Sequence, residues 1–203
     1  MKLYGSLMSP FVRMSMVTAM ECGLGPRVQL LPAPVKPDEV NKDLSKLSAI
    51  GKVPVLETDH GHPIYDSRVI MEYFAHVAGN KHVLPDDGVK RFRILTLLAL
   101  SQGMADASVA LRYETATRPE ASRWPAFTDR ITARLADCLD MLESDWHADL
   151  QDVTLGSIAT AAALGYIEVR DIVPNWRKGH ANLSQFADRF AKRESMMNTT
   201  PKA

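Results

Sequence analysis

The sequence lacks the features that would place the chain outside a reducing compartment. It has only two cysteines among 203 residues, Cys22 and Cys138, each within an apolar, helix-like run. Two distant cysteines do not form the disulfide framework of a small secreted protein, so a cytoplasmic setting is expected. The first residues also lack the apolar stretch and cleavage pattern of a signal peptide, so none is expected.

Long apolar runs and an excess of one charge sign are missing as well. The longest apolar run, residues 153–169, contains Ser157, Thr160 and Glu168 and is shorter than the roughly 20 residues that a membrane span needs. The 24 lysines and arginines are matched by 24 aspartates and glutamates. This balance argues against a nucleic acid or an anionic membrane as a partner. With 46% hydrophobic residues, the chain is expected to form a globular core and to suit a small-molecule enzyme or an oligomer.

The first part of the chain alternates strand and helix signals. Strands are predicted at residues 2–5, 27–31, 53–57 and 63–65, and a proline-rich loop at 32–37. Helices are predicted at 10–23, in a short stretch capped by Asp38 and ending at Leu47, and at 67–79. The last of these helices is expected to bury one apolar face, made of Val69, Ile70, Tyr73, Phe74 and Val77.

The second part carries only helix signals. Residues 80–88 include a Pro-Asp-Asp-Gly turn and are predicted to be a linker. Helices are expected at 92–113, across an amphipathic segment from Ile131 to Trp146, at 155–169 and at 183–193. The segment 155–169 is apolar on nearly all sides, so it should be the central helix of a bundle. The predicted organisation is an α/β domain at 1–79, a linker at 80–88 and an all-helical domain at 89–203.

Ser9 lies where the first helix should begin, directly before Pro10. A serine at this position caps a helix by accepting a hydrogen bond from a free backbone N–H, and this structural role is sufficient to explain it. The same geometry has a functional reading, because a helix N-terminus attracts anions and a hydroxyl there can donate to a thiolate. The spacing alone leaves both interpretations open.

Two further segments allow similar pairs of interpretations. In Gly51-Lys52-Val53-Pro54, the proline starts a strand, and general frequencies favour a trans bond, although a cis bond would leave the Val53 backbone available. Asp66-Ser67 precedes a helix, and Ser67 is expected to be its cap. Alternatively, the Ser67 hydroxyl and the helix N–H groups hold a carboxylate while Asp66 pairs with an ammonium group.

Taken together, these segments resemble the glutathione S-transferase family. Ser-Pro-Phe-x-Arg from Ser9, Gly-Lys-Val-Pro-Val-Leu from Gly51 and Asp-Ser-x-x-Ile from Asp66 fall where that family places them. The match continues through residues 154–159 and 182–195, and it is most similar to bacterial serine-type transferases. The resemblance implies a thioredoxin-like N-terminal domain followed by an all-α helical bundle.

The resemblance also implies a site and a reaction. Ser9 would stabilise the glutathione thiolate, the Val53 backbone before a cis Pro54 would pair with the cysteinyl moiety, and Asp66 and Ser67 would hold the γ-glutamyl group. Lys52 matches a position that contacts the glycyl end. Glutathione would be the cosubstrate of a conjugation to a small hydrophobic electrophile, and the family is usually homodimeric. The electrophile is expected between the domains, near Met8, Phe11, Met104, Ser108 and Leu111.

The sequence departs from the family pattern at two places. The box that opens the buried helix reads Thr154-x-x-Ser157 where the family has aspartate, and Arg193-Glu194-Ser195 stands where Arg-Pro-Ser is usual. Both bear on stability rather than chemistry, but divergence keeps a non-catalytic glutathione-binding role open. A glutathione-dependent isomerase is a further alternative, although its Ser-Ser-x-Ser run is missing. His60-x-His62 lacks a third ligand, so no metal is expected.

Overall fold

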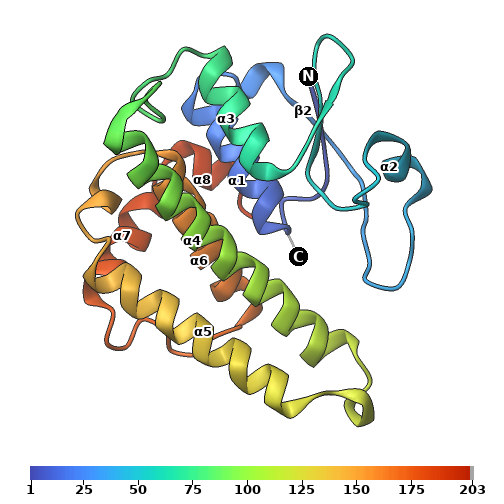
Figure 1. Cartoon of the computed structure of the whole chain (residues 1–203), viewed down its shortest axis with the longest axis vertical. Coiled ribbons are helices and arrows are strands. Elements are labelled where there is room, and N and C mark those ends of the chain that lie inside the picture. The colour runs from blue at the N-terminus through green and yellow to red at the C-terminus, as the bar shows by residue number, and fades with distance from the viewer. Residues whose placement is uncertain (202–203) are drawn as a thin grey trace. The chain divides into compact units, whose positions relative to one another are not determined.

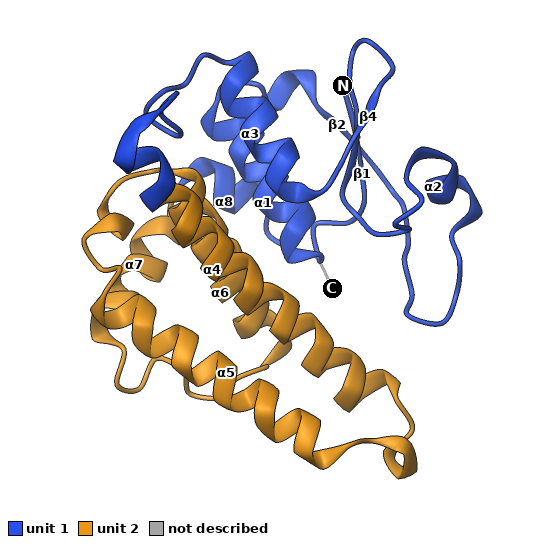
Figure 2. Cartoon of the chain, in the orientation of Figure 1, with its two compact units in different colours: residues 1–93, 193–203 blue, residues 94–192 orange. Residues whose placement is uncertain are grey.

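The chain folds into two compact units in a computed structural model that describes residues 1–201 (Figure 2). Residues 1–93 form the first unit together with the segment that begins at Arg193, and residues 94–192 form the second. The first unit thus includes residues 80–93 as well as a segment from the end of the chain. The domain limits and the linker expected at residues 80–88 stay a prediction.

The first unit is built on a four-stranded sheet with the order β2-β1-β3-β4. β1 (Lys2–Tyr4) pairs in parallel with β2 (Gln29–Leu31) and antiparallel with β3 (Val55–Glu57), which pairs antiparallel with β4 (Pro63–Ile64). The helices are α1 (Pro10–Glu21), α2 (Lys42–Leu47) and α3 (Ser67–Val77), with a 3-10 turn, η1, at Gly25–Arg27. The predicted order of βαβ, a helix and ββα is confirmed, and it gives the thioredoxin-like arrangement.

Helices cover both faces of this sheet (Figure 1). α1 and α3 pack against each other and against one face, where Leu3, Val12, Leu56 and Phe74 are completely buried. The other face carries a smaller cluster formed by Ala33, Leu44 and Val55, with Leu44 supplied by α2. Alternating side chains of short strands therefore reach two separate apolar layers, as a two-faced sheet requires.

Two details of the predicted helices are wrong. α2 is capped by Asn41 rather than Asp38, because the Asn41 side chain accepts hydrogen bonds from the backbone N–H groups of Asp43 and Leu44. α3 buries only part of the predicted face, since Ile70 and Phe74 are buried but Val69 and Val77 are exposed. The buried stripe follows the contact with α1 instead, at an i, i+3, i+4, i+7 spacing. Its members are Ser67, Ile70, Met71, Phe74 and Ala75.

The regular structure of the second unit, residues 94–192, is entirely helical. α4 (Gly88–Arg112) begins in the first unit and continues into the second, where it runs into a π-helical turn, η2, at Tyr113–Thr117. The other elements are the turns η3 (Glu120–Ser122) and η4 (Asp149–Gln151) and the helices α5 (Pro125–Ser144), α6 (Leu155–Arg170) and α7 (Ala181–Ala191). The predicted absence of strands from this half is confirmed for these residues.

α6 is buried on nearly every side, as its composition predicts. Its start is a reciprocal capping box, in which the Ser157 hydroxyl accepts from the Thr154 N–H at 2.9 Å and the Thr154 hydroxyl accepts from the Ser157 N–H at 3.4 Å. Serine therefore fills the place of the family's aspartate. Gly156 allows the close approach of α4, because a β-carbon there would lie 2.8 Å from Leu97 side-chain atoms.

The end of the chain contains a helix that the sequence pattern did not predict. A single helix was expected over 183–193, but α7 ends at Ala191 and a short helix, α8 (Glu194–Asn198), follows. Arg193 between them has an extended backbone, which interrupts the helix. α8 belongs to the first unit and packs against α1.

One segment within residues 1–201 is long and apolar enough to cross a membrane by length and composition alone. It is Gly88–Thr117, which comprises α4 and η2, and 56% of its most apolar stretch is buried inside the protein. A core helix of a folded protein has this character.

Candidate functional site

Three loops of the first unit meet at one end of its sheet. β3 is antiparallel to both β1 and β4. The end of β1, the start of β3 and the end of β4 therefore lie at the same end of the sheet. The segments that adjoin this end of the sheet are residues 5–9, 52–54 and 65–67. These segments carry Ser9, Lys52, Val53, Asp66 and Ser67, so the topology brings all five predicted glutathione-site residues to the same side of the sheet.

Ser9 is the N-cap of α1. Its backbone is extended, and its Oγ accepts from the Val12 N–H at 3.5 Å, the long limit of a hydrogen bond. Pro10 fills the first helical position, where its missing N–H costs nothing. The half-buried Ser9 hydroxyl acts only as an acceptor toward other described residues, so its proton is available to a ligand.

Gly5 allows two of these segments to approach each other closely. It leaves β1 with a φ of +147°, a conformation that suits glycine. A β-carbon there would clash with Val12 of α1 and lie 3.2 Å from the Val53 Cβ. The first turn of α1 and the segment before β3 therefore approach each other because position 5 has no side chain.

Val53 and Lys52 precede β3. The Val53–Pro54 peptide is cis, as the family resemblance implies and contrary to what general frequencies favour. Val53 is half-buried, and its N–H and C=O make no hydrogen bond to another residue within 1–201. Its backbone is thus available to a ligand, while Lys52 is exposed beside it.

Asp66, not Ser67, caps α3, which corrects the expectation from the sequence. Asp66 has an extended backbone and its Oδ1 accepts from the Arg68 N–H at 2.9 Å, whereas Ser67 is already helical. The Asp66 carboxylate also forms a 3.3 Å ion pair with the Arg68 guanidinium and stays half-exposed. Ser67 is buried at the start of the helix, where neighbouring N–H groups point along the axis.

The residues expected to contact the electrophile belong to two different units. Met8 and Phe11 are half-buried in the first unit. Met104, Ser108 and Leu111 are buried on α4 within the second unit, and the Ser108 hydroxyl donates to the Met104 carbonyl at 2.8 Å. Their predicted role in substrate binding stays a prediction.

Neither cysteine has the character of a nucleophile. Burial, together with the nearby Glu21 charge, raises the pKa of the Cys22 thiol to about 11, and burial raises the pKa of Cys138 as well. Both thiols are free. Among residues 1–201, no group of three or more His, Cys, Asp or Glu side chains is arranged to hold a metal ion.

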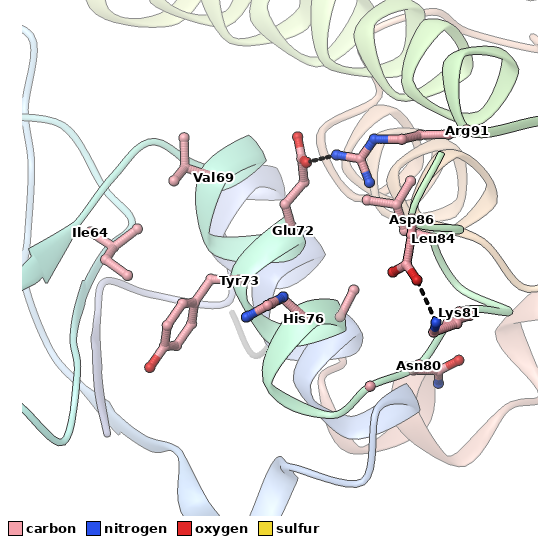
Figure 3. A pocket seen from close by; sticks show the side chains of 12 residues that line it. Ile64, Val69, Glu72, Tyr73, His76, Asn80, Lys81, Leu84, Asp86 and Arg91 are labelled. Atoms are coloured by element: carbon pink, nitrogen blue, oxygen red, sulfur yellow. Dashed lines mark hydrogen bonds and ion pairs between the residues drawn. The ribbon is translucent and has the colours of Figure 1, made fainter. Parts of the chain in front are cut away.

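A cavity of about 450 Å³ lies beside α3, lined by residues of β4, α3, the segment after α3 and the start of α4. Figure 3 shows Glu72 directed toward Arg91 of α4, with 2.5 Å between Oε2 and Nη2, and Asp86 directed toward Lys81. Its acidic and basic side chains thus pair with one another. None of the five predicted glutathione-site residues is among those that line it.

Comparison with known proteins identifies this arrangement. Residues 8–77 match the family model of the glutathione S-transferase N-terminal domain. The uncharacterized GST-like protein YibF of Escherichia coli K12 is 31% identical over 205 residues, which cover 99% of this chain and 98% of YibF. The chain belongs to the glutathione S-transferase family.

Solved structures of other members of the family agree with this assignment. A glutathione transferase family member from Pseudomonas fluorescens Pf-5, crystallised with bound glutathione, superposes with a TM-score of 0.96 at 34% identity, covering 100% of this chain and 99% of that one. A glutathione S-transferase from Methylobacillus flagellatus with bound glutathione has a TM-score of 0.85 at 28% identity, with 99% of each chain covered. The glutathione S-transferase fold predicted from the sequence is therefore confirmed.

Two residues that lie close to Ser9 in the chain, Gly5 and Arg13, were given no role from the sequence. Gly5 appeared only as the end of a strand, although a glycine between a strand and a helix is a recognised signal for close backbone approach. Arg13 was noted as the last residue of the Ser-Pro-Phe-x-Arg motif but was given no role. The structure places it on α1, one turn after Ser9.

Proposed function

We propose that the protein is an enzyme that conjugates the thiolate of glutathione to a small hydrophobic electrophile. The observation that carries the proposal is the geometry of Ser9, whose hydroxyl proton is available at the N-terminus of α1. The bound glutathione in two related structures supports the choice of ligand. The proposed cosubstrate is glutathione, with no metal.

In this mechanism, Ser9 Oγ–H donates to the glutathione sulfur and stabilises its anion. The N-terminal end of α1 adds a partial positive charge at the same place. Both interactions lower the pKa of the thiol from its ordinary value of about 8.5 and increase the fraction of nucleophile at neutral pH. The thiolate then forms a carbon–sulfur bond with the electrophile, and either a leaving anion departs or a proton adds to the neighbouring atom.

The remaining loops would hold the rest of the tripeptide. The Val53 backbone offers one donor and one acceptor to the cysteinyl unit, and exposed Lys52 offers an ammonium group to the glycyl carboxylate. The γ-glutamyl group carries both charges, which suit the Asp66 carboxylate and the N–H groups at the start of α3. Contacts of the electrophile with Met8, Phe11, Met104, Ser108 and Leu111 stay a prediction.

Two measurements on the purified chain test the proposal. Retention on immobilised glutathione tests binding, and conjugation of glutathione to an activated chloronitrobenzene, followed by absorbance, tests chemistry. Retention without turnover of a panel of electrophiles would favour a non-catalytic binding protein. Turnover of a double-bond isomer with glutathione regenerated would favour the isomerase. Absence of retention would contradict the proposal itself.

Replacing Ser67 with alanine is expected to weaken glutathione binding about tenfold, or ~1.4 kcal/mol. The reason is the loss of one hydrogen bond to a charged group at the γ-glutamyl end. Isothermal titration calorimetry measures the change. Ser45→Ala is the matched control, because among residues 1–201 its hydroxyl bonds only to the carbonyl of Asn41, the cap of α2. Equal dissociation constants for Ser67→Ala and the native chain would leave Ser67 with a structural role alone.

We also propose a homodimer in the cytoplasm, with a role in detoxification. Four exposed apolar side chains of the first unit lie just before or on α3 and at the start of α4, and a second copy of the chain that covered them would remove them from water. They are Tyr65, Val69, Val89 and Phe92. Light scattering distinguishes a dimer of 22.5 kDa chains from a monomer. A monomer at micromolar concentration would contradict this part of the proposal.

A further inference from the structure

The Ser-Pro-Phe-x-Arg motif ends on Arg13, which the proposed function leaves without a role. The Arg13 side chain is only 7% exposed. Its Nη2 donates to the Met196 carbonyl at 3.1 Å, and its Nε donates to Thr199 Oγ1 at 3.5 Å. Both acceptors are neutral, so the guanidinium has no carboxylate partner within residues 1–201.

A buried guanidinium without a counter-ion is unusual. Arginine is rarely buried unless it is paired, because the charge loses its hydration and an apolar side chain of similar volume would avoid that cost. Burial lowers the pKa of Arg13 from its ordinary value. An arginine in a protein nevertheless stays protonated at neutral pH. The first unit therefore holds a permanent positive charge in its interior.

This charge belongs to the same end of α1 as Ser9. The Arg13 N–H donates to the Ser9 carbonyl at 3.0 Å, which fixes the two residues one turn apart. Residues i and i+4 share one face of a helix, with about 5–6 Å between their β-carbons, and long side chains lean toward the helix N-terminus. In a poorly solvated interior the field of the guanidinium is weakly screened. It adds to the positive end of the helix dipole.

Most other charges on the elements that pack against α1 are neutralised by nearby partners and so offset little of this field. α1 contacts α3, α8, β1 and η1. Most carboxylates and cations on these elements and their neighbours form ion pairs with one another. Within residues 1–201, two groups do not: Glu194 on α8, whose carboxylate accepts a hydrogen bond from Asn198, and the exposed His76 on α3. The pairs are Glu21–Arg193, Lys2–Glu57, Arg27–Asp59, Asp66–Arg68 and Glu72–Arg91.

We propose that Arg13 is an electrostatic positioning residue, whose buried charge, held by the Met196 carbonyl and Thr199, favours an anion at Ser9. The inference rests on the proposed function for the identity of that anion, the glutathione thiolate. The field itself is a property of the chain alone. Arg13 does not touch the reacting atoms in this proposal and acts through the potential at the start of α1.

The potential at Ser9 can be measured without glutathione. A Ser9→Cys substitution places a thiol at the cap, and the pH dependence of its alkylation by iodoacetamide gives its pKa. Cys22 and Cys138 react late because burial raises the pKa of both thiols. The chain with Ser9 intact gives their background rate. Arg13→Gln, Arg13→Lys and Arg27→Gln are then introduced into the Ser9→Cys background.

Arg13→Gln should raise the pKa of this thiol by about one unit, a roughly tenfold loss of thiolate at pH values well below that pKa. Arg13→Lys, which keeps the charge, should restore most of the shift. Arg27→Gln removes an exposed arginine of the same unit and should leave the pKa unchanged. If circular dichroism shows that Arg13→Gln does not fold, Arg13→Met, which preserves more of the side-chain volume, replaces it.

The inference would be overturned if the pKa of the thiol at position 9 were the same in the Ser9→Cys chain with Arg13 and in the one with Arg13→Gln or Arg13→Met. Arg13 would then have a structural role alone. A shift that Arg13→Lys does not reverse would also overturn it, because a packing defect rather than charge would then be responsible. These outcomes do not depend on glutathione. A chain that fails to bind glutathione but shows the shift would contradict the proposed function and leave this inference standing.

Discussion

Replacing Glu21 with glutamine is expected to lower the free energy of unfolding by about 2–3 kcal/mol. The Glu21 carboxylate accepts hydrogen bonds from both Arg193 Nε and Arg193 Nη2 at 2.7 Å and from the Ser195 hydroxyl at 2.5 Å. Its side chain is only 11% exposed. The substitution removes the Glu21 charge from beside a partly buried guanidinium, and breaking such an ion pair is costly, although the 40% exposure of Arg193 moderates the loss.

Urea denaturation of the native and Glu21→Gln chains measures this difference. Glu39→Gln is the matched control, because Glu39 forms a single ion pair with Lys36 on the surface of the same unit. An exposed pair of that kind contributes less than about 1 kcal/mol. If the two substitutions shift the midpoint equally, the Glu21 cluster is no stronger than a surface pair.

The stabilisation by Glu21 should also depend on pH in a defined direction. Burial raises the pKa of this carboxyl group, but the hydrogen bonds from Arg193 and Ser195 and the Arg193 charge outweigh burial and lower the pKa overall. A carboxyl group with a lowered pKa in the folded state stabilises the fold above its unfolded pKa of about 4.3, and the contribution is lost as the pH falls through the folded value. The gap between the native and Glu21→Gln chains should therefore be constant near neutrality and shrink below about pH 4.

The Glu21 cluster marks the limit of what the sequence predicts about this fold. Periodicity gave the order of the strands and helices in the first unit and the helical character of the second. Glu21 and Arg193, however, are 172 residues apart. No local pattern reports that the end of the chain returns to α1, and α8 is too short to show a period of its own.

Helix ends and helix faces were predicted less well than helix positions. Asp66 and Ser67 are both good caps, and the choice depends on which residue keeps an extended backbone. The same ambiguity separates Asp38 from Asn41 at α2. On α3, two overlapping apolar stripes exist, and the position of α1 decides which is buried. Tertiary contacts therefore settle what the local sequence leaves open.

The candidate site follows a similar division. Motifs singled out Ser9, Val53, Asp66 and Ser67, and the antiparallel pairing of three strands brings their loops to one edge. The roles of Gly5 and Arg13 could not be predicted from the sequence, because each depends on a contact between segments that are distant along the chain. Gly5 is explained by its approach to Val53, and Arg13 by its burial against Met196 and Thr199.

Replacing Ser9 with alanine is expected to slow conjugation by about 10- to 100-fold near pH 6.5. The Ser9 hydroxyl is a side-chain donor at the start of α1, and a hydrogen bond to a charged group contributes roughly 1.5–3 kcal/mol. Its loss raises the pKa of bound glutathione by about one to two units. Affinity should fall less than turnover, because the contacts to the two ends of the tripeptide remain.

Three variants separate the chemical role of Ser9 from its role as a cap. Ser9→Gly lacks the hydroxyl but retains most of the cap stability, so it should lose activity as Ser9→Ala does without an equal loss of stability. Ser9→Thr keeps a hydroxyl and should retain part of the activity. Ser6→Ala, in the same loop, removes a hydroxyl that lies three residues before the cap of α1, so it should have little effect.

The thiolate absorbance of bound glutathione, titrated against pH, decides the assignment. The deficit of Ser9→Ala should disappear as the pH rises through the raised pKa, because the thiol then ionises without help from the hydroxyl. Superimposable titrations with equal turnover would remove Ser9 from the mechanism and transfer its role to the backbone N–H groups of the first turn of α1. A raised pKa with unchanged turnover would mean that a later step, such as product release, limits the rate.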